Sequence, residues 1–149
     1  MNIIRDTREK VGFYNFTSYN VNIVVRKLDT GDYSLEGYEK DFTIERKKTV
    51  AELCQNVTQK RFTNELKRLS LMKWPFIILE FTVEDVLDFP RNADLPAKIK
   101  NKIKVTGPYI LRRIGEIMRD YRIPLLFCSN KYYAEEMTYS LMKRINDNG

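Results

Sequence analysis

Two short apolar runs constrain the fold of this chain more than any other feature. PFIILEF at 75–81 and IPLLFCS at 123–129 have the length of strands, and Glu80 is the only charged residue in either. Apolar runs of this length are typical of strands buried on both faces of a sheet. A stretch with apolar residues at helical spacing precedes each run. The sequence therefore predicts an α/β fold in which a mixed central sheet is flanked by helices.

Local patterns place the remaining elements. We expect strands at 2–5, 21–28, 32–36 and 41–45, and helices at 49–71, 107–121 and 131–146. Thr49 is suited to cap the first helix, and Pro108 is tolerated in the first turn of the second. The last helix is expected to bury Ala134, Met137, Leu141 and Ile145.

The residue types that are missing exclude several kinds of catalysis. The chain has no histidine, and its two cysteines, Cys54 and Cys128, lie far apart. Ser-His-Asp and Cys-His mechanisms and zinc sites built from these residues are therefore excluded. The six glycines are scattered and form no phosphate-binding loop. Any catalysis must use carboxylates, lysines and arginines.

The charge balance favours a polyanionic partner. Lysine and arginine number 26 against 20 acidic residues, so nucleic acid is the first candidate and an anionic membrane surface the second. No apolar run approaches the roughly 20 residues of a spanning helix, and the N-terminus lacks the order of segments found in a signal peptide. We expect a cytoplasmic protein.

The hairpin over GDYSLEGYEKDFTIERKK, residues 31–48, carries the main candidate site. If EGYEK forms the turn, Tyr33 lies opposite Ile44 and Asp32 lies opposite Glu45. Opposed residues in an antiparallel pair have Cβ atoms about 4.5–5.5 Å apart on one face. Two carboxylates placed so close repel each other unless a cation lies between them, and their hard oxygens suit Mg²⁺ or Mn²⁺.

Strand alternation separates the roles of the residues that follow. Glu45 and Lys47 share one face of the strand, while Arg46 points to the other. An acid followed by Glu-x-Lys fits metal-dependent phosphodiester hydrolysis, in which the metal activates a water and the lysine orients it. Charged residues are also common on hairpins, where they prevent edge-to-edge aggregation or support a turn.

A wider set of motifs resembles the nuclease domain of the XPF-type structure-specific endonucleases. The motifs are DTRE at 6–9, GDY at 31–33, IERK at 44–47, RF at 61–62, the run PFIILEF and the segment from Val105 to Arg144. They cover most of the chain, and the last segment is similar to compact phage and prokaryotic relatives.

The resemblance implies a restriction-endonuclease-like fold of the PD-(D/E)xK type. It also implies a Mg²⁺- or Mn²⁺-dependent DNA endonuclease that acts at branches or junctions in replication, recombination or repair, in a phage or a prokaryotic host. Asp32 and Glu45 would bind the metal with support from Asp6, and Lys47 would orient the water. Arg8 and Arg46 would contact phosphate or brace the acids, and Glu9 would have a lesser role.

Two departures from the family pattern limit what can be carried over. The acid that usually follows the Glu-Arg-Lys motif is shifted by one position to Glu52, which leaves its role open. We expect one nuclease domain over residues 1–149, without the helix-hairpin-helix domain that grips duplex DNA and mediates dimerisation in many relatives. A homodimer or a partner protein therefore remains open.

Basic residues outside the hairpin add a candidate DNA surface. Lys60, Arg61, Lys67 and Arg68 recur at seven-residue spacing, which fits either a DNA-tracking stripe or a solvated helix face. The run KIKNKIK at 98–104 is expected to be a flexible basic loop. Two other functions stay open: a catalytically silent DNA-binding or partner-docking module, and an exonuclease or RNA-acting enzyme of the same fold.

Overall fold

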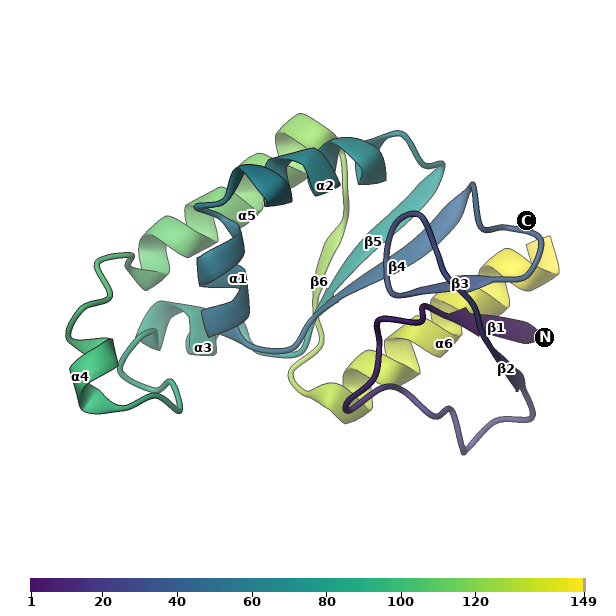
Figure 1. Cartoon of the computed structure of the whole chain (residues 1–149), viewed down its shortest axis with the longest axis horizontal. Helices are drawn as coiled ribbons and strands as arrows, with labels where there is room; N and C mark the ends of the chain where they lie inside the picture. Colours follow the sequence, from purple (N-terminus) through teal and green to yellow (C-terminus); the bar gives the residue numbers. More distant parts are fainter. Residues whose placement is uncertain (149) are drawn as a thin grey trace.

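The computed structural model describes residues 1–148, which form six strands and six helices (Figure 1). The strands are β1 (Asn2–Arg5), β2 (Asn22–Val25), β3 (Tyr33–Leu35), β4 (Phe42–Lys47), β5 (Trp74–Leu79) and β6 (Leu125–Phe127). The helices are α1 (Val50–Asn56), α2 (Lys60–Ser70), α3 (Val83–Asp88), α4 (Ala97–Lys100), α5 (Gly107–Tyr121) and α6 (Lys131–Asn148). Within the described residues, no helix is long and apolar enough to cross a membrane.

The strands form one mixed sheet in the order β2-β1-β3-β4-β5-β6. β1 is parallel to β2 and antiparallel to β3, and β3 is antiparallel to β4. β4, β5 and β6 are parallel, and the stretches between them contain the helices that cross from one strand to the next. The predicted mixed sheet with flanking helices is confirmed.

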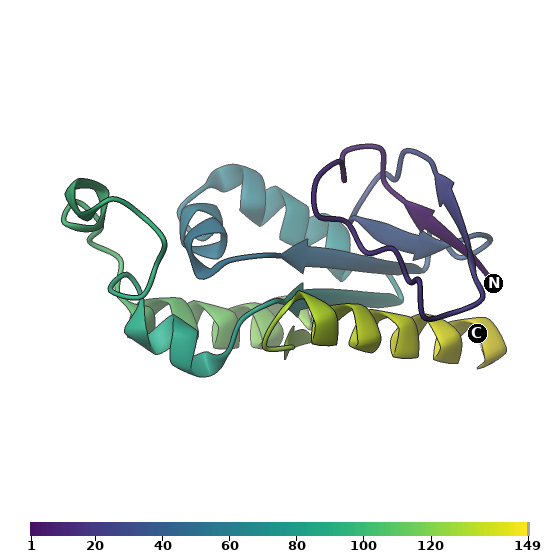
Figure 2. The same cartoon turned by 90° about the horizontal axis from the view of Figure 1, so that it is seen from below.

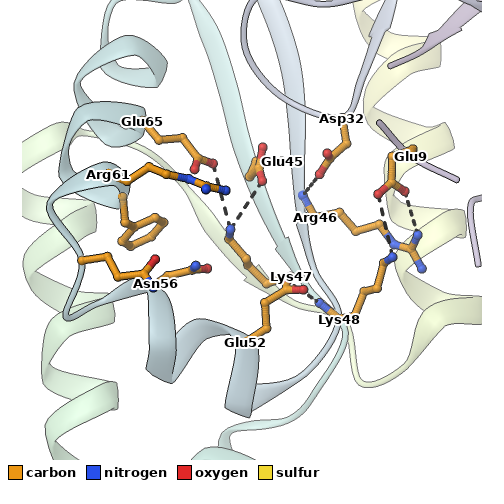
Figure 3. A pocket seen from close by; sticks show the side chains of 12 residues that line it. Glu9, Asp32, Glu45, Arg46, Lys47, Lys48, Glu52, Asn56, Arg61 and Glu65 are labelled. Atoms are coloured by element: carbon orange, nitrogen blue, oxygen red, sulfur yellow. Dashed lines mark hydrogen bonds and ion pairs between the residues drawn. The ribbon is translucent and has the colours of Figure 1, made fainter. Parts of the chain in front are cut away.

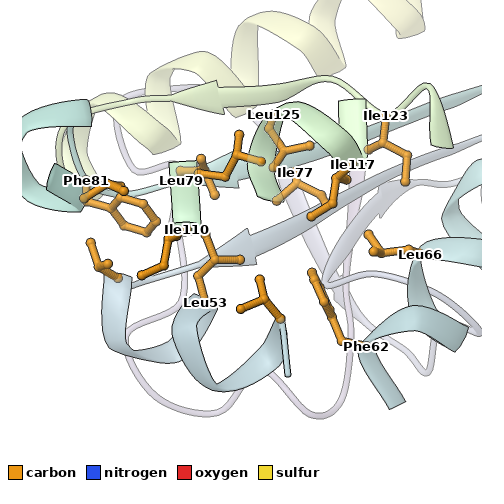
Figure 4. Packing of buried hydrophobic residues seen from close by; sticks show 14 of the residues in the cluster. Leu53, Phe62, Leu66, Ile77, Leu79, Phe81, Ile110, Ile117, Ile123 and Leu125 are labelled. Atoms are coloured by element: carbon orange, nitrogen blue, oxygen red, sulfur yellow. The ribbon is translucent and has the colours of Figure 1, made fainter. Parts of the chain in front are cut away.

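Each face of the sheet carries its own apolar core. On one face, β5 residues Ile77 and Leu79 pack with side chains of α1, α2 and α5, including Leu53, Leu66 and Ile117 (Figure 4). The neighbouring β5 residue Ile78 faces the other core, where α6 and an aromatic loop over residues 13–19 cover the sheet. Figure 2 shows α1 and α2 above the strands and α6 running along them from below.

The expected helix at 49–71 is wrong in one respect, because it is two helices. Thr49 caps α1 as predicted, with its side chain accepting a hydrogen bond from Glu52 N. α1 ends at Asn56, and α2 begins only at Lys60, where Phe62 starts a new buried stripe. A straight helix cannot turn both apolar stripes toward the sheet, so the chain breaks between them.

The C-terminal half follows the prediction more closely. α5 begins at Gly107 with Pro108 in its first turn, and Thr106 caps it. The expected buried face of α6 is wrong in part, because Met137 is exposed while Thr138 and Met142 are buried. Part of the expected basic loop at 98–104 is helical, since α4 reaches Lys100.

Candidate active site

The β3–β4 hairpin places Asp32 and Glu45 side by side. Tyr33 pairs with Ile44 as predicted, and Asp32 N donates to Ile44 O at 2.8 Å. The Asp32 carboxylate is fixed by Arg46 N, which donates to Oδ2 at 2.8 Å. Gly31 has φ +86, and a Cβ there would lie 1.8 Å from Thr43 Oγ1, so only glycine fits directly before the acid.

Strand alternation puts Glu45 and Lys47 on the face covered by α1 and α2. Lys47 Nζ lies 3.4 Å from Glu45 Oε1 and 4.0 Å from Glu65 Oε1. The same ammonium lies 5.2 Å from the centre of the Phe62 ring. The Lys47 side chain is only 6% exposed, so its charge is held inside the site rather than in solvent.

These side chains line two adjoining pockets between the hairpin and α2 (Figure 3). The central pocket has a volume of about 280 Å³ and is lined by Glu9, Asp32, Glu45, Arg46, Lys47, Lys48, Glu52, Asn56, Gln59, Arg61, Phe62 and Glu65. The adjoining pocket, of about 440 Å³, is lined by Arg8, Asp29, Thr30, Gly31, Asp32, Glu45, Arg61, Glu65 and Arg68. Asp32, Glu45, Arg61 and Glu65 border both.

Burial and mutual repulsion perturb the acids of the site. Burial raises the pKa of Asp32 to about 7, and the nearby Glu9 charge contributes to the rise. Burial also raises the pKa of Glu45 well above its usual range, and the Asp32 charge adds to this. For Lys47, burial acts to lower the pKa, but the Glu45 and Glu65 carboxylates outweigh it and raise the pKa.

The donor set of this site fits a divalent cation held by two protein carboxylates. Asp32 and Glu45 offer hard oxygens on one face, and a shared cation would relieve their mutual repulsion. Within residues 1–148, no group of three or more His, Cys, Asp or Glu side chains is arranged to hold a metal ion. Water and substrate phosphate oxygens would have to supply the other ligands, as is usual for Mg²⁺.

Arg46 braces the site from the opposite face of the sheet. Its guanidinium is 2% exposed, pairs through Nε with Glu80, and donates from Nη2 to Glu80 Oε1 at 3.1 Å. Nη1 donates to Glu9 Oε2 at 2.9 Å, and the Tyr14 ring lies 4.3 Å from the guanidinium carbon. Tyr14 Oη also donates to Glu80. Of the two roles expected for Arg46, the structure therefore favours bracing over phosphate contact.

Asp6 supports the backbone near the site rather than lining a pocket. Its Oδ1 accepts from Leu28 N at 2.7 Å, and its Oδ2 accepts from Arg8 Nε at 2.6 Å. Burial acts to raise the pKa of Asp6, but these hydrogen bonds together hold it below the usual value. Asp6 N donates to Asp32 O at 2.8 Å. Metal binding by Asp6 stays a prediction, whereas Arg8 braces Asp6 and also borders the adjoining pocket.

The expected basic stripe on α2 divides into two pairs. Arg61 and Arg68, the inner pair, border the adjoining pocket, and Arg61 also borders the central one. Lys60 and Lys67, the outer pair, are exposed and line neither. Successive residues on a helix differ by about 100° in direction, so each lysine points away from the pocket that the next arginine faces.

Three glutamates of the site were not assigned firm roles from sequence. Glu52 lines the central pocket and accepts from Lys48 N at 3.3 Å. Glu80 was missed as a site residue, although its lone charge in an apolar run was a signal. Glu65 was missed as well; its spacing of four residues from Arg61 places both on one side of α2.

The fold and site define the class, and comparisons with known proteins define the family. The mixed sheet with a carboxylate pair and a lysine on adjoining strands is restriction-endonuclease-like, as predicted. The model of the ERCC4 domain matches residues 5–141, and the chain belongs to this family. The predicted relationship to the XPF-type nuclease domain is thereby confirmed.

Two solved structures show the same fold. XPF from Aeropyrum pernix matches with a TM-score of 0.72 and 18% identity, over 99% of this chain and 66% of that chain. XPF from Aeropyrum pernix in complex with DNA matches with a TM-score of 0.71 and 18% identity, over 98% of this chain and 65% of that chain. This chain spans about two thirds of the length of each. A comparison with curated protein sequences found no match.

Proposed function

We propose that this chain is a Mg²⁺- or Mn²⁺-dependent deoxyribonuclease that cuts phosphodiester bonds internally at branched or junction DNA. The observation that carries this proposal is the meeting of Asp32, Glu45 and Lys47 on one face of the hairpin, at the border of a pocket. Membership of the ERCC4 domain family supports it, and a similar solved structure is described as a complex with DNA.

The residues divide the chemistry among them. A divalent ion bound by Asp32 and Glu45 would supply the positive charge that activates water and stabilises the attacked phosphate. Lys47 donates hydrogen bonds at this position and orients the attacking water. Arg61 and Arg68, at the pocket rim, attract and position the DNA phosphates. Arg46 keeps β4 in register by its ion pairs on the other face.

The alternatives are a silent module of the same fold and an exonuclease or RNA-acting enzyme. A silent module needs no matched set of two acids and a buried lysine, and this chain retains all three in one place. Circular and linear DNA distinguish internal cutting from end-dependent cutting. A matched RNA substrate distinguishes the two nucleic acids.

The deciding experiment is cleavage of labelled flap, fork, Holliday-junction and plain duplex DNA with Mg²⁺, Mn²⁺ or EDTA. Wild type is compared with Asp32→Asn and with Asp41→Asn, which makes the same change at an exposed position of the same hairpin. We expect metal-dependent cutting by wild type and Asp41→Asn and none by Asp32→Asn. Binding of every substrate without cutting by wild type would support the silent module instead.

A second copy of the chain is the partner we propose for the β6 edge. Within residues 1–148, β6 pairs with β5 alone, so it forms one edge of the sheet and its other side offers unpaired backbone groups. Beside it, Phe127, Tyr133 and Met137 line a pocket of about 410 Å³, and Tyr133 and Met137 are 57% and 40% exposed. An edge strand is complementary to another copy of itself across a two-fold axis, which favours a symmetric dimer here.

A further inference from the structure

Glu65 contributes an unpaired carboxylate oxygen to the central pocket. Its Oε1 is buried and has no hydrogen-bond partner, although Lys47 Nζ lies 4.0 Å away. A second oxygen in the same condition, Asn56 Oδ1, lines the same pocket. Buried acceptors without a donor are destabilising, so both oxygens require a donor that enters or moves.

Lys47 is a side chain of this pocket that can supply such a donor to Glu65. An ammonium has three N–H groups, and among the described residues that of Lys47 makes a single hydrogen bond, of 3.4 Å, to Glu45 Oε1. Glu45 comes from β4, whereas Glu65 and Asn56 come from the helices that cover this face (Figure 3). The ammonium therefore lies between a strand carboxylate and a set of unused acceptors on α1 and α2.

We propose that Glu65 is a positioning residue that holds the Lys47 ammonium in the site when Glu45 binds a divalent cation. This inference rests on the proposed function. Once Glu45 shares its charge with a cation, its attraction for Lys47 weakens, and the cation itself repels the ammonium. Glu65 borders both pockets together with Asp32 and Glu45, and its Oε1 lies 4.0 Å from Lys47 Nζ, so a small movement of either side chain closes the gap to Lys47.

The position of the ammonium decides the rate because Lys47 acts on the reacting atoms. A displacement of a catalytic group by about 1 Å can cost about a hundredfold in rate. Removing the Glu65 charge is therefore expected to lower the single-turnover rate about tenfold to a hundredfold, with DNA affinity changed less than about twofold. Glu65→Asp keeps the charge and is expected to recover part of the rate.

The test follows the Lys47 ammonium directly, by NMR of protein labelled with ¹⁵N in its lysine side chains. Lys47→Arg identifies the signal, and Glu116→Gln, which removes a carboxylate from α5, is the matched control. In wild type and control, we expect the signal with and without Mg²⁺, since a paired ammonium exchanges slowly. In Glu65→Gln, we expect the Lys47 signal to be present without Mg²⁺ and to disappear when Mg²⁺ is added.

Metal affinity distinguishes the positioning role of Glu65 from a role as a metal ligand. Mn²⁺ binding, measured by electron paramagnetic resonance, is expected to be unchanged in Glu65→Gln and weakened in Glu45→Gln. A Lys47 signal that survives Mg²⁺ in Glu65→Gln overturns the positioning role, and so does a loss of Mn²⁺ affinity equal to that of Glu45→Gln. If either result is found while wild type binds Mn²⁺ and cuts DNA, the positioning role of Glu65 is overturned and the proposed function stands. Wild type that binds no metal overturns the proposed function with it.

Discussion

Asp32→Asn is expected to abolish cleavage and yet to stabilise the metal-free protein above neutral pH. The cause is the raised pKa of Asp32 in the fold, about 7, against an ordinary value near 4 in the unfolded chain. Between these two values, the folded protein retains a proton that the unfolded chain has released. The free energy of unfolding therefore falls as the pH rises through this window, and Asn, which does not ionise, removes the fall.

The size of the effect follows from the same shift. A rise from about 4 to about 7 corresponds to about 4 kcal/mol of destabilisation of the ionised form at full strength. At about pH 8, above both pKa values, we therefore expect Asp32→Asn to be more stable than wild type by up to about 4 kcal/mol. At about pH 4, the two proteins should differ little.

Urea unfolding in EDTA across this pH range measures the difference, with Asp41→Asn as the control for a lost surface charge. Excess Mg²⁺ should then stabilise wild type by about 3 kcal/mol when it exceeds its dissociation constant about a hundredfold. The same addition should leave Asp32→Asn nearly unchanged. An Asp32→Asn protein that is less stable than wild type at about pH 8 without metal would refute the reasoning, because Asp32 would then stabilise the fold in its charged form.

Four further results are expected. Replacing the inner pair, Arg61 and Arg68, by Gln should reduce by about 2 the slope of the logarithm of the DNA-binding constant against the logarithm of salt concentration. The same change in the outer pair of lysines should have less effect. Equal slopes for the two variants would contradict the division of the basic stripe into inner and outer pairs. Lys47→Ala should lower turnover far more than DNA affinity, as kinetics with a separate binding assay will show. Arg46→Ala should cost about 3–5 kcal/mol in chemical unfolding, because it leaves the Glu80 charge buried without a cationic partner. Met137→Glu should dissociate the proposed dimer in sedimentation experiments, and an unchanged oligomeric state would argue against the β6 edge.

The sequence was sufficient for the hairpin because a strand has only two faces. Once Tyr33 is opposite Ile44, the positions of Asp32 and Glu45 follow without reference to the rest of the chain. The central strand β5 was equally predictable, since an apolar run of that length cannot be left in solvent. Local rules of period and capping also predicted the start of α5 at Gly107.

The sequence alone could not predict the contacts and helix orientations that depend on residues far apart in the chain. Nothing local indicates that Asp6 Oδ1 accepts a hydrogen bond from Leu28 N, because that bond depends on how the chain folds back. Met137 was expected in the core on helical spacing, but the rotation of α6 on the sheet buries Thr138 instead. The position of the Glu65 side chain depends in turn on the break between α1 and α2, because this break sets the direction of α2.

The order Glu-Arg-Lys allows Arg46 to stabilise the strand that carries the mutually repelling carboxylate of Glu45. Asp32 and Glu45 repel each other, so the hairpin is destabilised at the point where it must be most rigid. Side chains alternate along a strand, so Arg46, between Glu45 and Lys47, points to the opposite face. There Glu80 and Glu9 hold its guanidinium in a buried network. The brace therefore acts on the same strand as Glu45 and Lys47, while its guanidinium pairs with Glu9 and Glu80 on the other face of the sheet. Exchanging Arg46 and Lys47 would keep composition and charge, yet it would place a bulky fork in the pocket and leave Glu80 with a shorter partner, so both functions should fail together.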